Sequence, residues 1–355
     1  MVTEQQVLDA LRNVKDPELG KDLVTLGMIR DIKTCNGSVS FDLVLTTPAC
    51  PLKSQIKKAA EDAVTAVPGV ATVEVKLKAH VKRHAAPAEQ EKMLPGVKNV
   101  VAIASGKGGV GKSTVAVNIA IALAKSGAQV GLLDADIYGP SLPMLMGVNK
   151  RPEVRDGKII PIEKYGVKLM SLGFLIEEDT AMIWRGPMVA GAVKQLLTDV
   201  NWGKIDYLIV DLPPGTGDAQ LTLAQTVPLT GVVVVTTSQD MALKIASKAA
   251  IMFRKMDVPV LGIIENMSYF ICPGCGERTN IFSHGGGAAA AKRLAVPVLG
   301  QIPLEPETVV DSDKGHPTVA ARPNSEQGRV FIEIAGRVAA GVSQLSCFPT
   351  REDLI

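Results

Sequence analysis

The chain has 355 residues, which is long enough for two domains with separate hydrophobic cores. Hydrophobic residues make up 46% of it and charged residues 21%, and the formal net charge is only +2 at pH 7. This composition favours a globular α/β protein and gives no electrostatic reason to expect a nucleic-acid partner. No apolar run reaches the roughly 18 residues of a membrane-spanning helix, and no signal-like segment opens the chain, so we expect a cytoplasmic protein without a membrane partner.

The first eighty residues predict a small α+β domain. Helices are expected near 4–13 and 51–67, and strands near 28–33, 39–45 and 73–77. The polar stretch that follows lacks apolar periodicity, which is typical of a flexible linker. We therefore divide the chain into an α+β domain at 1–80, a linker at 81–95 and a larger domain at 96–355.

The larger domain alternates apolar strands with helices. Strands are expected near 100–104, 129–134, 168–172, 207–211, 232–237, 260–265 and 298–302, and helices near 113–126, 187–200, 242–256 and 326–343. This alternation predicts an α/β fold with a mainly parallel sheet covered by helices on both faces. Ligands of such sheets gather at the carboxyl ends of the strands.

A glycine-rich loop directly follows the first of these strands. Its residues are Gly106, Lys107, Gly108, Gly109, Val110, Gly111, Lys112 and Ser113, with Thr114 after them. A strand, a glycine loop and a helix in this order aim backbone NH groups and the positive end of the helix at one anionic point. Lys112 supplies a charge for the outer phosphates, and the hydroxyl of Ser113 is a suitable ligand for Mg2+. The loop therefore predicts a P-loop NTPase fold that binds a nucleoside triphosphate with Mg2+.

The same glycines also match the dinucleotide-binding pattern G-x-G-x-x-G, with Asp134 at about the distance of a ribose-binding acid. Against this alternative, the loop closes with Lys112 and Ser113, and a second acidic segment begins at Asp211. Hydride-transfer sites require neither feature, so we favour the triphosphate.

Acidic residues follow two of the predicted strands. Asp134, Asp136 and Asp211 stand where a triphosphate site needs carboxylates to hold a hydrated metal ion and to position water. Asp136 and Asp211 are the candidate catalytic acids, and the alternative for each, weaker for Asp211, is a solvated loop carboxylate. Gly215 and Gly217 would allow the loop after Asp211 to rearrange when a γ-phosphate is bound or lost.

The extra lysine early in the loop, Lys107, resembles the signature lysine of the deviant Walker A ATPases, the group that contains MinD, ParA, ArsA and the nitrogenase iron protein. In that family the lysine reaches the phosphates bound by the partner subunit, so the resemblance implies an ATP-bound homodimer with Lys107 in a catalytic role. An asparagine after a late strand binds adenine in the same family, and Asn266 occupies the matching place. Without the resemblance, a surface lysine and a strand-ending turn residue remain open alternatives.

Cys272 and Cys275 are separated by a Pro-Gly turn that allows both sulfurs to face one metal. This spacing suits zinc, an iron-sulfur cluster or a redox dithiol. One pair supplies half of the usual four ligands, and His284, which precedes three glycines, is more typical of a turn residue than of a ligand. A symmetric dimer would bring two pairs together, and its four thiolates fit one bridging 4Fe-4S cluster.

Several motifs together resemble the Mrp/ApbC iron-sulfur cluster carriers over about residues 95–345. These motifs are Gly106 to Thr114, Asp134 to Ser141, Trp184 to Pro187, Asp211 to Asp218, Glu265 to Ser268 and Cys272 to Gly276. The resemblance implies an ATP-hydrolysing homodimer that binds a labile 4Fe-4S cluster. Its partners would be assembly scaffolds and the client apoproteins that receive the cluster.

The N-terminal domain resembles the PaaD/SufT-like domain of cluster-assembly proteins. This resemblance depends on Asp16 to Leu19, Leu23 to Met28 and Thr46 to Pro51. Cys50 precedes an expected helix, whose dipole is able to lower the pKa of its thiol, so cluster handover and a buried structural role both stay open. Cys35 and Cys347 match no motif and are interpreted as ordinary thiols.

Two other functions are compatible with the phosphate loop, namely a MinD- or ParA-type positioning ATPase and an ATPase dimer held by structural zinc. The last residues, from Cys347 onward, contain a proline and mixed charges and would make a poor membrane-binding helix. A positioning role leaves Cys272 and Cys275 unexplained, whereas zinc explains them, because thiolates bind both metals.

Overall fold

The computed structural model describes residues 2–84, 93–176, 186–215, 218–283 and 285–347. The chain divides into two compact units. Unit 1 consists of Met1–Lys82 together with Ala339–Ile355, and unit 2 consists of Arg83–Val338. Among the described residues, no helix combines the length and apolar character that crossing a bilayer requires.

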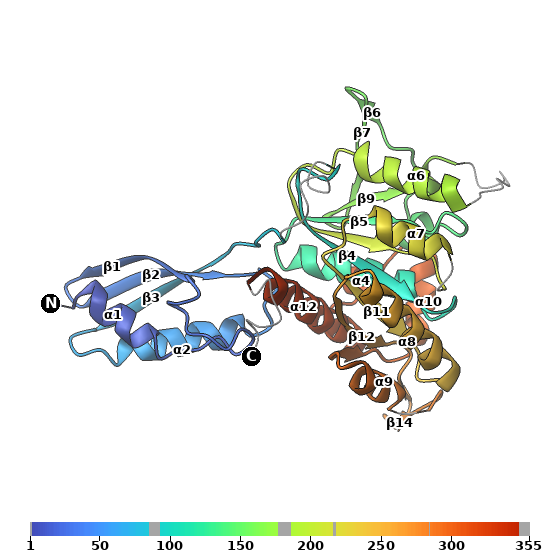
Figure 1. The fold of residues 1–355 in the computed structure, drawn as a ribbon. Coiled ribbons are helices and arrows are strands. Elements are labelled where there is room, and N and C mark those ends of the chain that lie inside the picture. The colour runs from blue at the N-terminus through green and yellow to red at the C-terminus, as the bar shows by residue number, and fades with distance from the viewer. Residues whose placement is uncertain (1, 85–92, 177–185, 216–217, 284, 348–355) are drawn as a thin grey trace. The chain divides into compact units, whose positions relative to one another are not determined.

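Unit 1 contains a three-stranded sheet and two helices (Figure 1). β1 (Ile29–Cys35) pairs antiparallel with β2 (Ser38–Leu45), and β2 pairs parallel with β3 (Thr72–Ala79). α1 (Glu4–Leu11) and α2 (Lys53–Thr65) bury one stripe each in the core of the unit. The apolar residues of that stripe recur at helical spacing, and they are Val7 and Leu11 in α1 and Ile56, Ala60 and Val64 in α2. All five predicted elements of this region are confirmed to within a few residues.

Unit 2 is built on an eight-stranded sheet with the order β15-β12-β11-β4-β10-β5-β9-β8. The strands are β4 (Val97–Ser105), β5 (Val130–Asp134), β8 (Ile162–Lys164), β9 (Val167–Ser171), β10 (Ile205–Asp211), β11 (Gly231–Thr236), β12 (Val260–Glu265) and β15 (Val298–Gln301). All neighbours pair in parallel except β8, which runs antiparallel to β9 at one edge. The predicted mainly parallel sheet is therefore confirmed.

Helices cover both faces of this sheet. The helices that begin in the described part of unit 2 are α4 (Lys112–Lys125), α5 (Leu142–Met146), α6 (Gly186–Thr198), α7 (Asp218–Thr226), α8 (Asp240–Lys255), α9 (Gly286–Leu294), α10 (Pro306–Asp313), α11 (Thr318–Ala321) and α12 (Glu326–Cys347). Val100, Ala102 and Ala104 of β4 share a core with Leu196 of α6 and Phe253 of α8. The alternate residues of β4 are buried as well, because side chains of a strand point to opposite faces and α4 packs on β4, β5 and β10.

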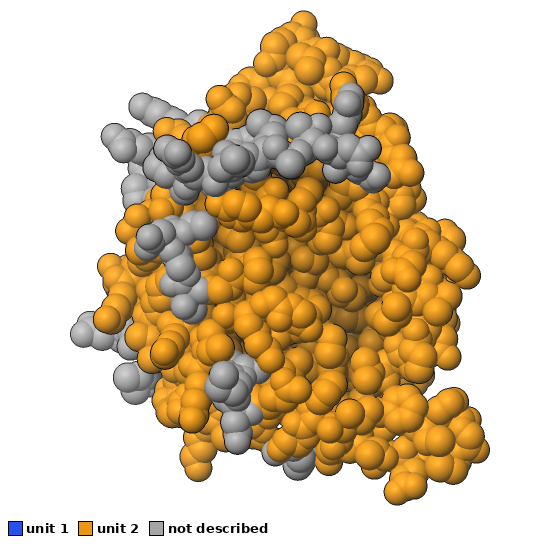
Figure 2. All heavy atoms as spheres, turned by 90° about the vertical axis from the view of Figure 1, so that its right-hand side faces the viewer, with its two compact units in different colours: residues 1–82, 339–355 blue, residues 83–338 orange. Residues whose placement is uncertain are grey.

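Two small hairpins stand outside the main sheet. β6 (Val154–Arg155) pairs with β7 (Lys158–Ile159), and β13 (Phe270–Ile271) pairs with β14 (Arg278–Thr279). The sequence did not predict them, because strands of two residues are too short to show periodicity. The same holds for the five-residue α5 and the four-residue α11. Figure 2 shows unit 2 from the right-hand side of Figure 1, where α10 lies, and the surface there is hollowed near its middle.

Candidate functional site

The glycine-rich loop connects the central strand β4 to α4, as predicted. Gly111 stands at the N-terminus of this 14-residue helix with a φ of +77°, and Gly109 has the same left-handed φ. Gly106 has no space for a side chain, since a Cβ there would lie 2.6–2.8 Å from atoms of Ile245 and Ala246 in α8. The loop is therefore held against its neighbours in a conformation that requires glycine at these points.

Lys112 and Asp211, the two residues with the strongest sequence prediction, meet in the structure. Lys112 Nζ donates to Asp211 Oδ1 in a buried ion pair and lies 3.4 Å from Ser113 Oγ. Their strands explain the meeting, because β4 leads into the loop and pairs with β10, which ends at Asp211. A buried ammonium needs an anionic partner. The carboxylate of Asp211 neutralises the charge of Lys112, as a bound phosphate would.

Asp134 and Asp136 occupy different environments. The carboxylate of Asp134 is buried and accepts hydrogen bonds from Asp136 N at 3.0 Å, Leu142 N at 3.2 Å and Ser171 Oγ at 3.1 Å. Burial, and secondly the charge of Asp211, raise the pKa of Asp134 to about 7. Burial also raises the pKa of Asp136, which is less enclosed. Asp134 thus anchors the loop after β5, and Asp136 is the better placed of the two to reach a ligand.

Lys107 is held by its own chain. Its Nζ donates to Gln239 Oε1 at 3.1 Å, and its carbonyl oxygen accepts from Ser105 Oγ at 3.0 Å. Gln239 immediately precedes α8, at the carboxyl end of β11. Sequence reasoning did not identify this glutamine, although its place after a strand next to β4 was a usable signal. The predicted contact of Lys107 with a partner subunit stays a prediction.

Asn266 lies directly against the phosphate loop. Its Nδ2 donates to Val110 O at 2.8 Å, and its backbone NH donates to Thr236 O at 2.8 Å. The preceding residue, Glu265, is fully buried at the end of β12. This carboxylate was not among the predicted site residues. The sequence signal for it was its place at the start of the motif Glu265 to Ser268, beside Asn266.

The two cysteines lie in the turn between β13 and β14. Cys272 N donates to Glu277 O at 2.9 Å, and Gly276 N donates back to Cys272 O at 2.8 Å, which closes the turn. Cys275 is exposed and Cys272 is half-buried. Hydrogen bonds from the backbone NH groups of Cys275 and Gly274 lower the pKa of the Cys272 thiol. This arrangement favours a thiolate, the form that binds metals.

Within the described residues, no third metal ligand accompanies the cysteine pair. Among the described residues there is no group of three or more histidine, cysteine or acidic side chains able to hold a metal ion. His284, the nearby candidate from the sequence, lies outside the described residues, as do Trp184, Arg185 and Gly217.

Cys50 is buried in unit 1 and donates to Glu18 Oε2 at 3.7 Å. Burial, and secondly the charge of Glu18, raise the pKa of its thiol to about 12. Of the two roles that the sequence left open for Cys50, the buried structural one agrees with this environment, and the pKa is raised instead of being lowered by the helix dipole. Desolvation and a neighbouring carboxylate both disfavour the thiolate, and together they outweigh the effect of the helix dipole on the pKa. The N-cap residue of α2, Leu52, makes no side-chain hydrogen bond at this helix end.

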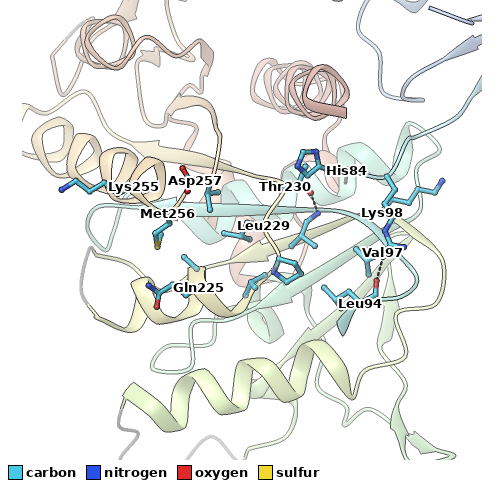
Figure 3. Close-up of a pocket in the computed structure, with 16 residues that line it drawn as sticks. His84, Leu94, Val97, Lys98, Gln225, Leu229, Thr230, Lys255, Met256 and Asp257 are labelled. Carbon is cyan, nitrogen blue, oxygen red and sulfur yellow. Dashed lines mark hydrogen bonds between the residues drawn. The ribbon is translucent and has the colours of Figure 1, made fainter. Parts of the chain in front are cut away.

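A large cavity of unit 2 lies elsewhere, at the amino ends of the strands (Figure 3). It has a volume of about 550 Å³ and is lined by, among others, Val97 and Lys98 at the start of β4 and Thr230 just before β11. The phosphate loop follows the opposite end of β4, so this cavity is not part of the nucleotide site. Its lining carries no motif that the sequence analysis recognised.

Comparisons with known proteins agree with this site. A family model described as NUBPL iron-transfer P-loop NTPase matches residues 96–339, and one described as iron-sulfur cluster assembly protein matches residues 4–76. The iron-sulfur cluster carrier protein of Synechocystis is 51% identical over 97% of this chain and 99% of its own length. That of Escherichia coli K12 is 44% identical over 94% of this chain and 91% of its own.

Solved structures confirm the fold. A nucleotide-binding protein from Archaeoglobus fulgidus, in complex with ADP, is 37% identical and matches with a TM-score of 0.60 over 69% of this chain and 96% of its own. The cell-division ATPase MinD of Pyrococcus furiosus, at 22% identity, matches with a TM-score of 0.52 over 68% and 98% of the two chains and shows the fold alone. The predicted enzyme class, an ATP hydrolase of the P-loop type, agrees with this family. The chain belongs to the NUBPL iron-transfer P-loop NTPases and carries an N-terminal iron-sulfur cluster assembly domain.

Proposed function

We propose that the protein is an ATP-hydrolysing carrier that holds a 4Fe-4S cluster between two copies of the chain and passes it to apoproteins. The cysteine turn is the observation that carries this proposal. It presents two thiols in one turn, with backbone amides directed at Cys272, and no further ligand accompanies them in the described part of the chain. A 4Fe-4S cluster takes four thiolates, and a twofold axis beside the turn supplies the missing two from the partner copy.

The phosphate loop supports the ATP-dependent half of the proposal. We assign the NH groups from Gly106 to Thr114 to the phosphates, the hydroxyl of Ser113 to Mg2+ and the amide of Asn266 to the adenine base. A bound triphosphate would take Asp211's place beside Lys112. Asp211, with Asp136, would then be free to hold the hydrated metal ion and orient the attacking water.

Lys107 has a separate role in this proposal. In a homodimer it would leave Gln239 and reach the phosphates held by the partner subunit, where its charge stabilises the transition state. Hydrolysis then depends on the assembled dimer, the same assembly that completes the cluster site. The curated relatives are named iron-sulfur cluster carrier proteins, which supports cluster transfer as the purpose of this assembly. Client apoproteins and assembly scaffolds would be its partners, in the cytoplasm.

Anaerobic reconstitution with iron and sulfide tests the proposal directly. Iron, sulfide and the native mass of the holo form are measured together, and one 4Fe-4S cluster per two chains is expected. A monomer that carries its full complement of iron contradicts the bridging site. Stoichiometric zinc with no bound iron indicates a structural-zinc ATPase instead, and a dimer that binds neither metal indicates a positioning ATPase.

A further inference from the structure

One short segment joins the phosphate loop to the cysteine turn. Residues 265–272, the connecting segment, begin with Glu265 at the end of β12 and end with Cys272. Within it, Asn266 Nδ2 donates to Val110 O at 2.8 Å and packs so closely against Gly111 that a Cβ there would overlap the nitrogen. A displacement of the loop backbone at these two residues is therefore transmitted directly to Asn266.

The connecting segment has little freedom to absorb such a displacement. Ser268 N donates to Ile302 O at 2.9 Å, and Tyr269 O accepts from Leu304 N at 2.7 Å. The corner between them and Asn266 is Met267, whose φ of +53° is a left-handed conformation uncommon outside glycine. A segment bonded along its length moves as one piece, because bending it would break these hydrogen bonds.

Glu265 clamps this corner to α9. Its buried carboxylate accepts hydrogen bonds from Ser268 Oγ, from Gly287 N at 2.5 Å and from Gln301 Nε2 at 3.4 Å. A Cβ at Gly287 would lie 2.5 Å from Glu265 Oε2, so the start of α9 lies directly against the carboxylate. A charge buried this deeply requires all of these donors, and it therefore holds them in one arrangement.

We propose that the connecting segment couples occupancy of the phosphate loop to the metal affinity of the cysteine pair, and that Glu265 is the positioning residue of this coupling. The inference rests on the proposed function and specifies how nucleotide regulates the cargo site. Phosphate binding alters the contact between Val110 and Asn266. Because Glu265 prevents the corner from relaxing, the change reaches Cys272.

The test measures coupling in the full-length chain with Zn2+ as the probe. Zn2+ affinity is determined by competition with a chromophoric chelator, with and without Mg-ADP, and Mg-ADP affinity is determined with and without Zn2+. We expect each ligand to change the affinity of the other by the same factor, of about fivefold or more, since coupling free energies are reciprocal. A purely structural role for Glu265 would alter both affinities and leave this factor unchanged.

Two variants and a control complete the experiment. Glu265→Gln keeps the shape and removes the charge, and we expect it to bind each ligand alone within about threefold of wild type while the coupling factor falls below about twofold. Ser268→Ala removes one donor to the clamp, is expected to reduce the factor, and decides the question if Glu265→Gln does not fold. Glu307→Gln changes an exposed carboxylate in the small pocket beside the cysteine turn and should keep the full factor.

The possible results separate the two proposals. If both ligands bind wild type without affecting each other, or if Glu265→Gln and Ser268→Ala keep the wild-type factor, the coupling proposal is wrong and the proposed function stands. If Zn2+ does not bind at the cysteine pair, or nucleotide does not bind at the loop, the proposed function fails and the coupling falls with it.

Discussion

The two ends of the connecting segment differ in how complete they are within one chain. At the phosphate loop, buried side chains from several strands already meet, and Lys112 has Asp211 as its partner. At the cysteine turn, a two-stranded hairpin presents one exposed and one half-buried thiol with no other ligand nearby in the described chain. The loop region is therefore largely organised by folding, whereas the proposed cluster site would draw its remaining ligands from a second copy of the chain. Each of the following predictions challenges or refines this difference.

Loss of the loop lysine should have the largest effect. Lys112→Ala removes the charge that we propose to contact the phosphates and leaves Asp211 buried without its ion-pair partner, so we expect ATP hydrolysis to fall by at least about a hundredfold. The unpaired carboxylate should also lower the free energy of unfolding by about 3–5 kcal/mol. Turnover assays and thermal unfolding measure the two effects.

Lys98→Ala is the matched control for that change. Lys98 is also paired with an aspartate, Asp206, but at the amino end of β4 and with more exposure to solvent. Its loss should leave hydrolysis near wild type. Equal losses of turnover in the two variants would mean that the loop lysine acts only through stability.

Removal of one metal-binding thiol is the next prediction. Cys272→Ala leaves two thiolates per dimer, too few for a 4Fe-4S cluster, so bound iron and sulfide should drop to background after reconstitution. Folding should be preserved because the turn is at the surface. Cys35→Ala, which removes another exposed thiol, should retain the cluster. Iron retention by Cys272→Ala at the wild-type level would place the cargo elsewhere.

Replacement of Lys107 tests whether ATP hydrolysis needs a residue from a second chain. Lys107→Ala removes a side chain bonded to Gln239 and is expected to reduce hydrolysis by about tenfold or more, with nucleotide affinity nearly unchanged. Gln239→Ala removes only the partner within the chain and should have a smaller effect. Normal turnover in Lys107→Ala would argue against a contact across the dimer.

The smallest expected effect concerns the pH dependence of stability. The pKa of Asp134 is raised from 3.8 to about 7 in the folded protein, so the native state binds a proton more tightly than the unfolded chain does. Its contribution to the free energy of unfolding is therefore fully present below about pH 4 and is lost as the pH rises toward 7. Denaturant unfolding of wild type and Asp134→Asn, compared from pH 5 to 8, should show a flatter pH dependence in the variant. Parallel curves would contradict the assignment.

Much of the site could be predicted from sequence because its signals are local. The order of strand, glycine loop and helix around Lys112 predicts a phosphate site. The Pro-Gly turn between Cys272 and Cys275 predicts that the two thiols lie close together in one turn. Chain neighbours alone produce these arrangements. The carboxyl ends of parallel strands meet at one edge, which is why Asp211 was expected near the loop before its position was known.

The environment of a side chain was harder to predict. For Cys50 the sequence left a reactive thiol at a helix end and a buried structural thiol both open, and only the fold shows that the thiol is buried against Glu18 with a raised pKa. Glu265 begins a motif that was recognised, but the motif does not reveal its partners Gly287 and Gln301, which are distant in sequence. Burial and long-range pairing depend on how whole elements pack, and short patterns do not contain that information.

The sequence by itself determined the alternation of seven sheet strands with the longer helices, the phosphate loop and the cysteine turn, because periodicity, glycine and chain spacing act over a few residues. Only the tertiary structure decided that Lys112 pairs with Asp211, that Asn266 donates to Val110 and that the carboxylate of Glu265 accepts from Gly287. Those contacts join residues that the chain keeps far apart. They form only where the packed sheet brings its strand ends together and removes water from around their charges.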